Sequence, residues 1–104
     1  MKEYFIIQKD KFILKKRGAY TDLINKKGVY YFFNDKDDLL YIGSSKNLYV
    51  RFVSHISNGG MFSFFEWNTF LAIYCDNYKE LEKIELRQHH TYLNGKGFTS
   101  KIYK

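Results

Sequence analysis

The sequence predicts one small α+β domain, and three observations carry this prediction. Two β-prone runs at 29–33 and 39–42 flank a short polar segment, which indicates a β-hairpin. A third β-prone run lies at 67–75, and runs with helical spacing occupy 48–57 and 77–93. The chain has 104 residues, which is enough for one compact core and too few for two domains.

Composition narrows the function classes. Seventeen Lys and Arg against eleven Asp and Glu give a formal net charge of +6, which favours an anionic polymer as the partner. Charge alone does not decide this, because a lysine-rich surface also serves solubility. The single cysteine, Cys75, excludes a disulfide framework and a thiolate zinc site. No apolar run is long enough to span a bilayer and no signal peptide is recognisable, so the sequence predicts a cytoplasmic protein in a reducing compartment.

The N-terminal part is expected to be an extension. Residues 1–27 precede the hairpin and are predicted to pack on a domain that spans 28–104. Within the extension, β-prone runs at 4–7 and 12–14 indicate a hairpin or two separate short segments. The segment 20–26 has the composition of a short helix.

The polar centre of the hairpin determines which side chains share a face of the sheet. If Asp35 and Lys36 form the tip, Tyr30 lies directly opposite Tyr41 and the two tyrosines share one face. A loop one residue longer would place them on opposite faces, because side chains alternate along a strand with a period of two. The register is therefore open to a direct test.

The helix predicted at 48–57 presents a mixed stripe, and an Asn-Gly-Gly sequence ends it. Arg is suited to clamp a phosphate through its planar guanidinium, although an isolated helical Arg is commonly a surface ion-pair partner. The residues that share the stripe at helical spacing are Leu48, Arg51, Phe52 and His55.

The helix predicted at 77–93, which opens on a capping-box pattern, has a carboxylate on its inward side. Glu85 lies there among the residues of the stripe. A buried carboxylate without a partner is costly, so Glu85 must hold a cation, accept hydrogen bonds or lie at the edge of a cleft. An edge Glu paired with a Lys is the alternative. The predicted inward stripe comprises Leu81, Ile84, Gln88 and Tyr92.

Two short motifs and three single residues follow one another in a defined order. The tripeptide GVY, which ends at Tyr30, is followed by YIG, which begins at Tyr41, and then by Arg51, His55 and Glu85. This constellation resembles the GIY-YIG nuclease family. In its motifs the chain is similar to the N-terminal incision domain of the excision-repair nuclease UvrC and to the catalytic domains of homing endonucleases.

The resemblance covers residues 28–93 and implies a fold, a reaction and a set of roles. The implied fold is the GIY-YIG nuclease fold, a small three-stranded antiparallel sheet flanked by helices. The implied activity is that of a DNA endonuclease that hydrolyses phosphodiester bonds with one divalent metal ion, Mg²⁺ or Mn²⁺. By position, the matching residues are the motif tyrosines Tyr30 and Tyr41, the close-approach glycine Gly43, the phosphate-binding Arg51, the homing-endonuclease histidine His55 and the metal ligand Glu85.

The expected mechanism divides these roles. Tyr30 accepts a proton from the attacking water, and Tyr41 orients that water or takes over the same role. Arg51 braces the phosphate oxygens, and His55 supports the phosphate or relays protons. Nucleic-acid contacts are expected at three positions around the end of the second motif: Gly43, Ser45 and Lys46.

The chain departs from the family pattern at three positions. Ser44 stands where UvrC-like members carry Lys, and Lys27 replaces the Pro that usually precedes the first motif. The family usually closes with an Asn near the end of the domain. Residues 98–103 contain none, and Asn94 directly follows the predicted end of the last helix.

Two other functions remain open from the sequence. One is a non-catalytic DNA-binding module on a degenerate GIY-YIG scaffold, and the other is a protein-interaction domain that docks a partner through the aromatic segment 61–65. No separate DNA-recognition motif is present in the sequence, so specificity would come from residues 1–27, from oligomerisation or from a protein partner. DNA-repair and mobile-element contexts both fit.

Overall fold

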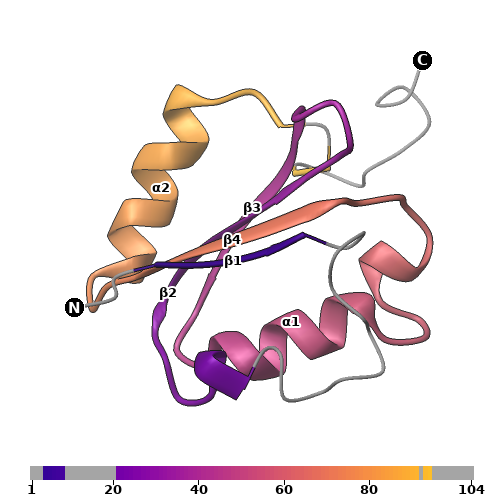
Figure 1. Ribbon diagram of the computed structural model, residues 1–104. Coiled ribbons are helices and arrows are strands. Elements are labelled where there is room, and N and C mark those ends of the chain that lie inside the picture. Colours follow the sequence, from indigo (N-terminus) through magenta and orange to yellow (C-terminus); the bar gives the residue numbers. More distant parts are fainter. Residues whose placement is uncertain (1–3, 9–20, 92, 95–104) are drawn as a thin grey trace.

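The computed structural model describes residues 4–8, 21–91 and 93–94 (Figure 1). It confirms the α+β class, but the antiparallel sheet has four strands where three are implied by the sequence, in the order β1-β4-β2-β3. None of the described helices has the length and apolar character needed to cross a membrane. The elements are β1 (Tyr4–Gln8), β2 (Gly28–Phe33), β3 (Leu39–Ser45), α1 (Leu48–Ile56), the 3-10 helix η2 (Met61–Ser63), β4 (Thr69–Tyr74) and α2 (Tyr78–Gln88).

The additional strand, β1, comes from the segment predicted to be an extension. It pairs antiparallel with β4, with Tyr4 opposite Ile73, and it buries Phe5 and Ile7 in the main core. A partner so distant in the sequence leaves no local signal, which is why the sequence predicted only a hairpin within this segment or two separate short segments. The second run of that expected hairpin, 12–14, lies outside the described residues.

The predicted helix at 20–26 is reduced to a 3-10 turn at 21–23. Asn25 has a φ of +60°, a left-handed conformation that ends helical geometry. The backbone carbonyl of Lys26 then accepts a hydrogen bond from the N–H of Leu48, at 2.9 Å. This bond ties the chain before β2 to the first residue of α1.

The β2–β3 hairpin is confirmed, but its register differs from the predicted one. Tyr30 pairs with Gly43 and Phe32 pairs with Tyr41, so the predicted Tyr30–Tyr41 pair is wrong by two positions. An even shift leaves both tyrosines on the same face of the sheet. They are diagonal neighbours there, with ring centroids 6.0 Å apart.

The side chain of Asn34 explains the shift, because it closes a turn longer than the expected one. Its Oδ1 accepts hydrogen bonds from the backbone N–H groups of Lys36 and Asp38, at 2.8 and 2.9 Å. Asp37 has a φ of +65°, which Asp tolerates better than most residues. The register then shifts by one residue beside Phe33, so the turn and this irregularity together preserve the facing of β3.

The two helices cover opposite faces of the sheet (Figure 1). The α1 face holds the main core, where Phe32 stacks on Phe62 with centroids 3.9 Å apart and meets Trp67 edge-on at 5.4 Å. The α2 face holds a smaller cluster around Val29 and Tyr31. Since a fully buried large apolar side chain contributes about 1.5–3 kcal/mol, the α1 face supplies most of the packing energy.

The boundaries of α1 agree with the prediction, and the end of α2 does not. Asn47 caps α1 by accepting a hydrogen bond from the N–H of Val50. α2 ends at Gln88, well before the predicted end at Leu93. The physical reason is tertiary: Leu93 is buried and donates its backbone N–H to the carbonyl of Leu40 at 2.7 Å.

The inward stripe of α2 also differs from the predicted one. Ile84 is 41% exposed and Gln88 is exposed, whereas Tyr92 lies outside the described residues. Asn77 precedes the helix without a side-chain capping bond, so the expected capping box is not formed. The apolar residues of α2 that pack on the sheet are Tyr78, Leu81 and Leu86.

Candidate active site

Tyr30 and Gly43 lie directly opposite each other on the α1 face of β2 and β3. The Tyr30 ring passes so close to Gly43 that a Cβ at position 43 would overlap the phenol ring and its hydroxyl oxygen. The requirement for glycine here is therefore one of space, since the φ of Gly43 is not positive. Gly43 allows the Tyr30 ring to reach across the pair toward α1.

The Tyr30 hydroxyl forms a hydrogen bond with His55, which lies on the buried side of α1. Its oxygen lies 2.8 Å from His55 Nε2, and the His55 ring also packs edge-on against Tyr41 at 5.3 Å. Burial, with a smaller contribution from the nearby charge of Arg51, lowers the pKa of His55 to about 4. His55 is therefore a neutral imidazole near pH 7, and such a ring carries one nitrogen that can accept a proton.

Tyr30 is held in its protonated form. Burial is the main cause that raises its pKa above the usual value for tyrosine, and the neighbouring Tyr41 adds to the rise. The charge of Arg51 acts in the opposite direction and favours the phenolate. The environment of the hydroxyl thus contains both a proton acceptor, His55, and a cation that would stabilise the deprotonated state.

Arg51 lies on α1 one turn before His55, and its residue surface is exposed. Its charge affects the pKa values of both Tyr30 and His55, so the guanidinium lies within electrostatic range of their hydrogen bond. Four of the predicted site residues are thus brought together on the α1 face and form the tyrosine cluster: Tyr30, Tyr41, Arg51 and His55.

Glu85, the fifth, is on α2 and therefore on the opposite side of the sheet. Its Oε1 accepts a hydrogen bond from the Tyr31 hydroxyl at 2.9 Å and lies 3.6 Å from Nε2 of His89. Burial, followed by this bond, raises the pKa of Tyr31, so the phenol stays protonated and donates. The expectation that Glu85 accepts hydrogen bonds is met through a tyrosine, and the carboxylate does not touch Tyr30 or Tyr41 among the contacts of the described residues.

A second carboxylate of α2 reaches the same strand pair and was missed in the sequence. Glu82 does not belong to the predicted inward stripe, yet it is half-buried and accepts a hydrogen bond from the Ser44 hydroxyl, next to Gly43. The two carboxylates are three residues apart and so lie on one side of the helix. A stripe drawn through Glu82, Glu85 and the packed apolar residues of α2 would have revealed it.

Glu82 and Glu85 are the side chains on α2 that could ligate a metal ion. No group of three or more His, Cys, Asp or Glu residues that could hold a metal occurs within the described ranges. Mg²⁺ commonly binds through one or two carboxylates and completes its shell with water and substrate phosphate. These two oxygen-donor side chains fit that mode, and they do not form a closed protein cage.

Asn94 clamps the outer edge of β3. Its Oδ1 accepts the backbone N–H of Ile42 and its Nδ2 donates to the carbonyl of the same residue, both at 2.8 Å. Ile42 is the central residue of the YIG motif, so Asn94 positions the motif backbone. From the sequence, Asn94 was placed only directly after the predicted end of the last helix, because its contact depends on the path of the chain after α2.

The residues expected to contact nucleic acid lie where β3 ends. Gly43 is buried under Tyr30, while the Ser45 hydroxyl donates to the Asn47 carbonyl and accepts its N–H, both at 3.0 Å. Lys46 is exposed between them. Ser45 therefore fixes the start of α1, and Lys46 presents an exposed positive charge at this end of the sheet.

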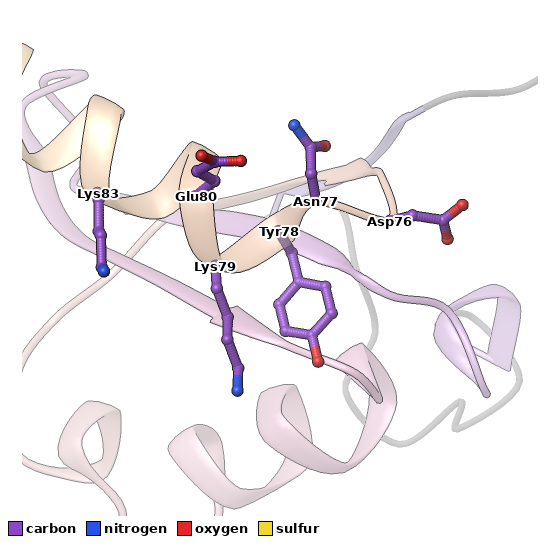
Figure 2. A pocket seen from close by; sticks show the side chains of 6 residues that line it. All are labelled: Asp76, Asn77, Tyr78, Lys79, Glu80 and Lys83. Atoms are coloured by element: carbon purple, nitrogen blue, oxygen red, sulfur yellow. The ribbon is translucent and has the colours of Figure 1, made fainter.

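More lysines occur at the same end of the sheet, where α2 begins. The N–H of Cys75 donates to the carbonyl of Lys27, which joins the end of β4 to the start of β2. A hollow of about 440 Å³ lies at the first turn of α2. Figure 2 shows two of its lining residues, Lys79 and Lys83, which project from one side of the helix. None of the five predicted catalytic residues lines this hollow.

Comparison with known families gives one result. The family model described as the GIY-YIG catalytic domain matches residues 26–96, a range that holds both motifs, the tyrosine cluster and both α2 carboxylates. The chain belongs to the GIY-YIG family. Domains of this family are generally nucleases. No curated protein and no solved structure matches the chain, so no individual relative refines this assignment.

Proposed function

We propose that this GIY-YIG domain is a DNA endonuclease that uses one divalent metal ion. The observation that carries the proposal is the cluster formed by Tyr30, Tyr41, Arg51 and His55 on the two motif strands and α1. Phosphodiester hydrolysis needs a proton acceptor for the attacking water and a cation for the phosphate oxygens. The cluster contains both.

His55 is the final proton acceptor in the proposed relay. The neutral imidazole lies with Nε2 2.8 Å from the Tyr30 oxygen, so Nε2 accepts the Tyr30 proton while the Tyr30 oxygen takes a proton from water. This transfer requires the bound substrate to raise the pKa of His55 well above its value of about 4 in the free chain. The relay would leave a positive charge on His55 beside Arg51. The substrate phosphate supplies the negative charge that offsets it, so the relay is favoured only when DNA is bound.

The other two residues of the cluster act on the substrate. Tyr41 is half-buried beside Tyr30 and orients the attacking water or replaces Tyr30 as the residue that touches it. Arg51 is exposed and braces the non-bridging phosphate oxygens through its planar guanidinium. Exposed lysines at the end of the sheet track the DNA backbone, with Lys46 and Lys27 nearest to the motif strands.

The metal ion, Mg²⁺ or Mn²⁺, is assigned to Glu85, with Glu82 as the neighbouring carboxylate on α2. When bound, it supplies neutralisation of charge on the phosphate and on the leaving oxygen. Tyr31 orients the Glu85 carboxylate through its hydrogen bond, and Ser44 does the same for Glu82.

The proposal is tested by incubating the purified chain with single-stranded, duplex and branched DNA, with Mg²⁺, with Mn²⁺ and with a chelator. We expect metal-dependent cleavage of at least one form. Tyr30→Phe removes the relay hydroxyl and should reduce cleavage by about a hundredfold or more. Tyr4→Phe, which changes an exposed tyrosine on β1, is the matched control and should leave cleavage unchanged.

A non-catalytic DNA-binding module is the second candidate, and a specific observation favours it. Tyr30 is only 1% exposed, and Glu85 bonds to the opposite face of the sheet from the tyrosine cluster. If the chain binds DNA in a salt-dependent manner but cleaves no form with either metal, this second candidate replaces the endonuclease.

A further inference from the structure

An apolar groove lies at the end of the sheet opposite Lys27, Lys46 and the start of α2. It has a volume of about 450 Å³ and sits between the β2–β3 turn and the segment after η2, where Leu40, Phe64 and Phe65 form its apolar wall. Phe64 is 74% exposed, more than any other large hydrophobic side chain in the described part of the chain. A large exposed aromatic beside a concave surface is typical of an interaction site.

The fold holds Phe64 in this position. On one side, Phe62 is buried in the main core, and the N–H groups of Phe64 and Phe65 both donate to the carbonyl of Met61. On the other side, the N–H of Asn68 donates to the carbonyl of Phe33 at 2.8 Å and ties the segment to the hairpin. The side chain of Phe64 therefore projects outward from a backbone that is anchored at both ends.

The rim of the groove is acidic, in contrast to the chain as a whole. Asp35, Asp38 and Glu66 line it with Lys36 as the single basic residue, although the full chain carries a net charge of +6. Asn34 fixes part of the rim by donating its Nδ2 to the Asp38 carboxylate at 3.0 Å. These carboxylates repel the phosphates of DNA and attract a cation.

We propose that this groove docks an arginine-bearing segment of a partner protein. A guanidinium stacks on an exposed aromatic ring and pairs with carboxylates in one plane, which is the combination that Phe64 and the acidic rim present. The apolar stem of the arginine and an adjacent apolar residue of the partner would pack against Leu40 and Phe65. No residue of the tyrosine cluster lines the groove, so the inference does not depend on nuclease activity.

The test uses the full chain, labelled with ¹⁵N, and the synthetic peptide acetyl-Gly-Arg-Leu-Arg-Gly-amide. We expect saturable chemical-shift changes confined to residues 34–38 and 64–66. The same peptide with Glu in place of Arg should cause none. Because the chain has a net charge of +6, general electrostatic attraction works against a basic peptide, and binding must come from a local acidic surface.

Two variants, one single and one double, then test whether the peptide binds in the groove. Phe64→Ala should weaken peptide binding by about fivefold or more, whereas Val50→Ala, which truncates a 57% exposed residue on α1, should not change it. Asp35→Asn combined with Glu66→Gln should weaken binding and reduce its salt dependence. Asp76→Asn combined with Glu80→Gln, at two exposed positions at the start of α2, removes the same number of charges and is the charge-matched control.

The inference is overturned if binding is not saturable, if the shifts lie outside the groove, or if Phe64→Ala and Val50→Ala weaken binding equally. DNA binding and cleavage are measured on the same variants. If Phe64→Ala weakens DNA binding instead of peptide binding, the groove is a nucleic-acid surface and the arginine proposal is wrong. If cleavage is absent in every variant while the peptide binds as expected, only the proposed nuclease function fails.

Discussion

The two faces of the sheet have opposite chemistry, although neighbouring residues of one strand supply both. Tyr30 turns toward α1 and meets a neutral histidine and an arginine, whereas Tyr31 turns toward α2 and donates to Glu85. One face therefore offers a phenol beside a cation, and the other offers carboxylates. Because β3 is the edge strand beside β2, a phosphate that used both faces would have to lie at this edge, beyond the stretch that Leu93 and Asn94 engage.

This difference shows how a small sheet keeps opposite charges apart. If a carboxylate lay beside Arg51, it would form an ion pair with the guanidinium and compete with the phosphate for it. The alternation of side chains along β2 separates the two kinds of group without any added structure.

The largest effect is expected from Gly43→Ala. The new methyl group would overlap the Tyr30 ring, so the ring must leave its place on the α1 face, and we expect a loss of stability at the upper end of about 1–3 kcal/mol together with loss of cleavage. Thermal unfolding and the cleavage assay measure the two effects. Gly59→Ala is the control, because Gly59 has open space around it and a φ of +91°, so its cost is conformational. Equal retention of cleavage in both variants would contradict the close approach of Tyr30.

The second effect concerns the neutral histidine of the α1 face. The unfolded chain protonates His55 near pH 6.5 while the folded chain does so only near pH 4, so protons favour unfolding between these values. The contribution of His55 is complete above pH 6.5, is lost as the pH falls toward 4, and levels off below that. The full loss amounts to about 3 kcal/mol. Urea unfolding from pH 7 to 4 should show this decline, and His55→Gln should flatten it.

The third effect concerns the carboxylates of the α2 face. Glu85→Gln keeps an acceptor for Tyr31 but removes the charge, so we expect cleavage to fall by about a hundredfold or more while stability changes little. DNA binding should persist, because it depends on dispersed lysines. Glu82→Gln is the matched variant one turn away. If Glu82→Gln abolishes cleavage and Glu85→Gln does not, the metal assignment moves to Glu82.

The smallest effect is expected from Arg51→Lys, which returns to the α1 face. The charge is kept and the planar fork is lost, so cleavage should fall about tenfold, equivalent to about 1.4 kcal/mol of transition-state stabilisation. DNA affinity should change less than the cleavage rate. An equal fall in both would make Arg51 an anchor for DNA with no preference for the transition state.

The sequence predicted the elements better than their connections. Local patterns were sufficient for α1 and for the hairpin strands, because apolar spacing and the Asn47 cap act within a few residues. The register escaped prediction because the Asn34 side chain sets the turn. Two features depend on contacts between segments that are distant in the sequence: the pairing of β1 with β4 and the early end of α2. Local periodicity carries no information about such contacts.

The site was predictable to a similar degree. Motif spacing identified the residues that meet on the α1 face, because Arg51 and His55 are fixed by one helix and Tyr30 by one strand. It did not reveal that Glu85 and Glu82 approach from the other side. That arrangement depends on which side of α2 meets the sheet, and the misplaced Ile84 shows that the apolar pattern of this short helix is too weak to decide it.

The clamp at Ile42 has a consequence for the behaviour of the protein at high concentration. An outermost strand exposes a row of backbone donors and acceptors that can recruit a strand from another molecule and start aggregation. Leu93 and Asn94 engage these groups at Leu40 and Ile42, so an incoming strand finds that stretch of β3 already occupied. Leu93 and Asn94 therefore protect this stretch of the motif strand from pairing with another molecule, and shortening the protein before Leu93 would expose that edge.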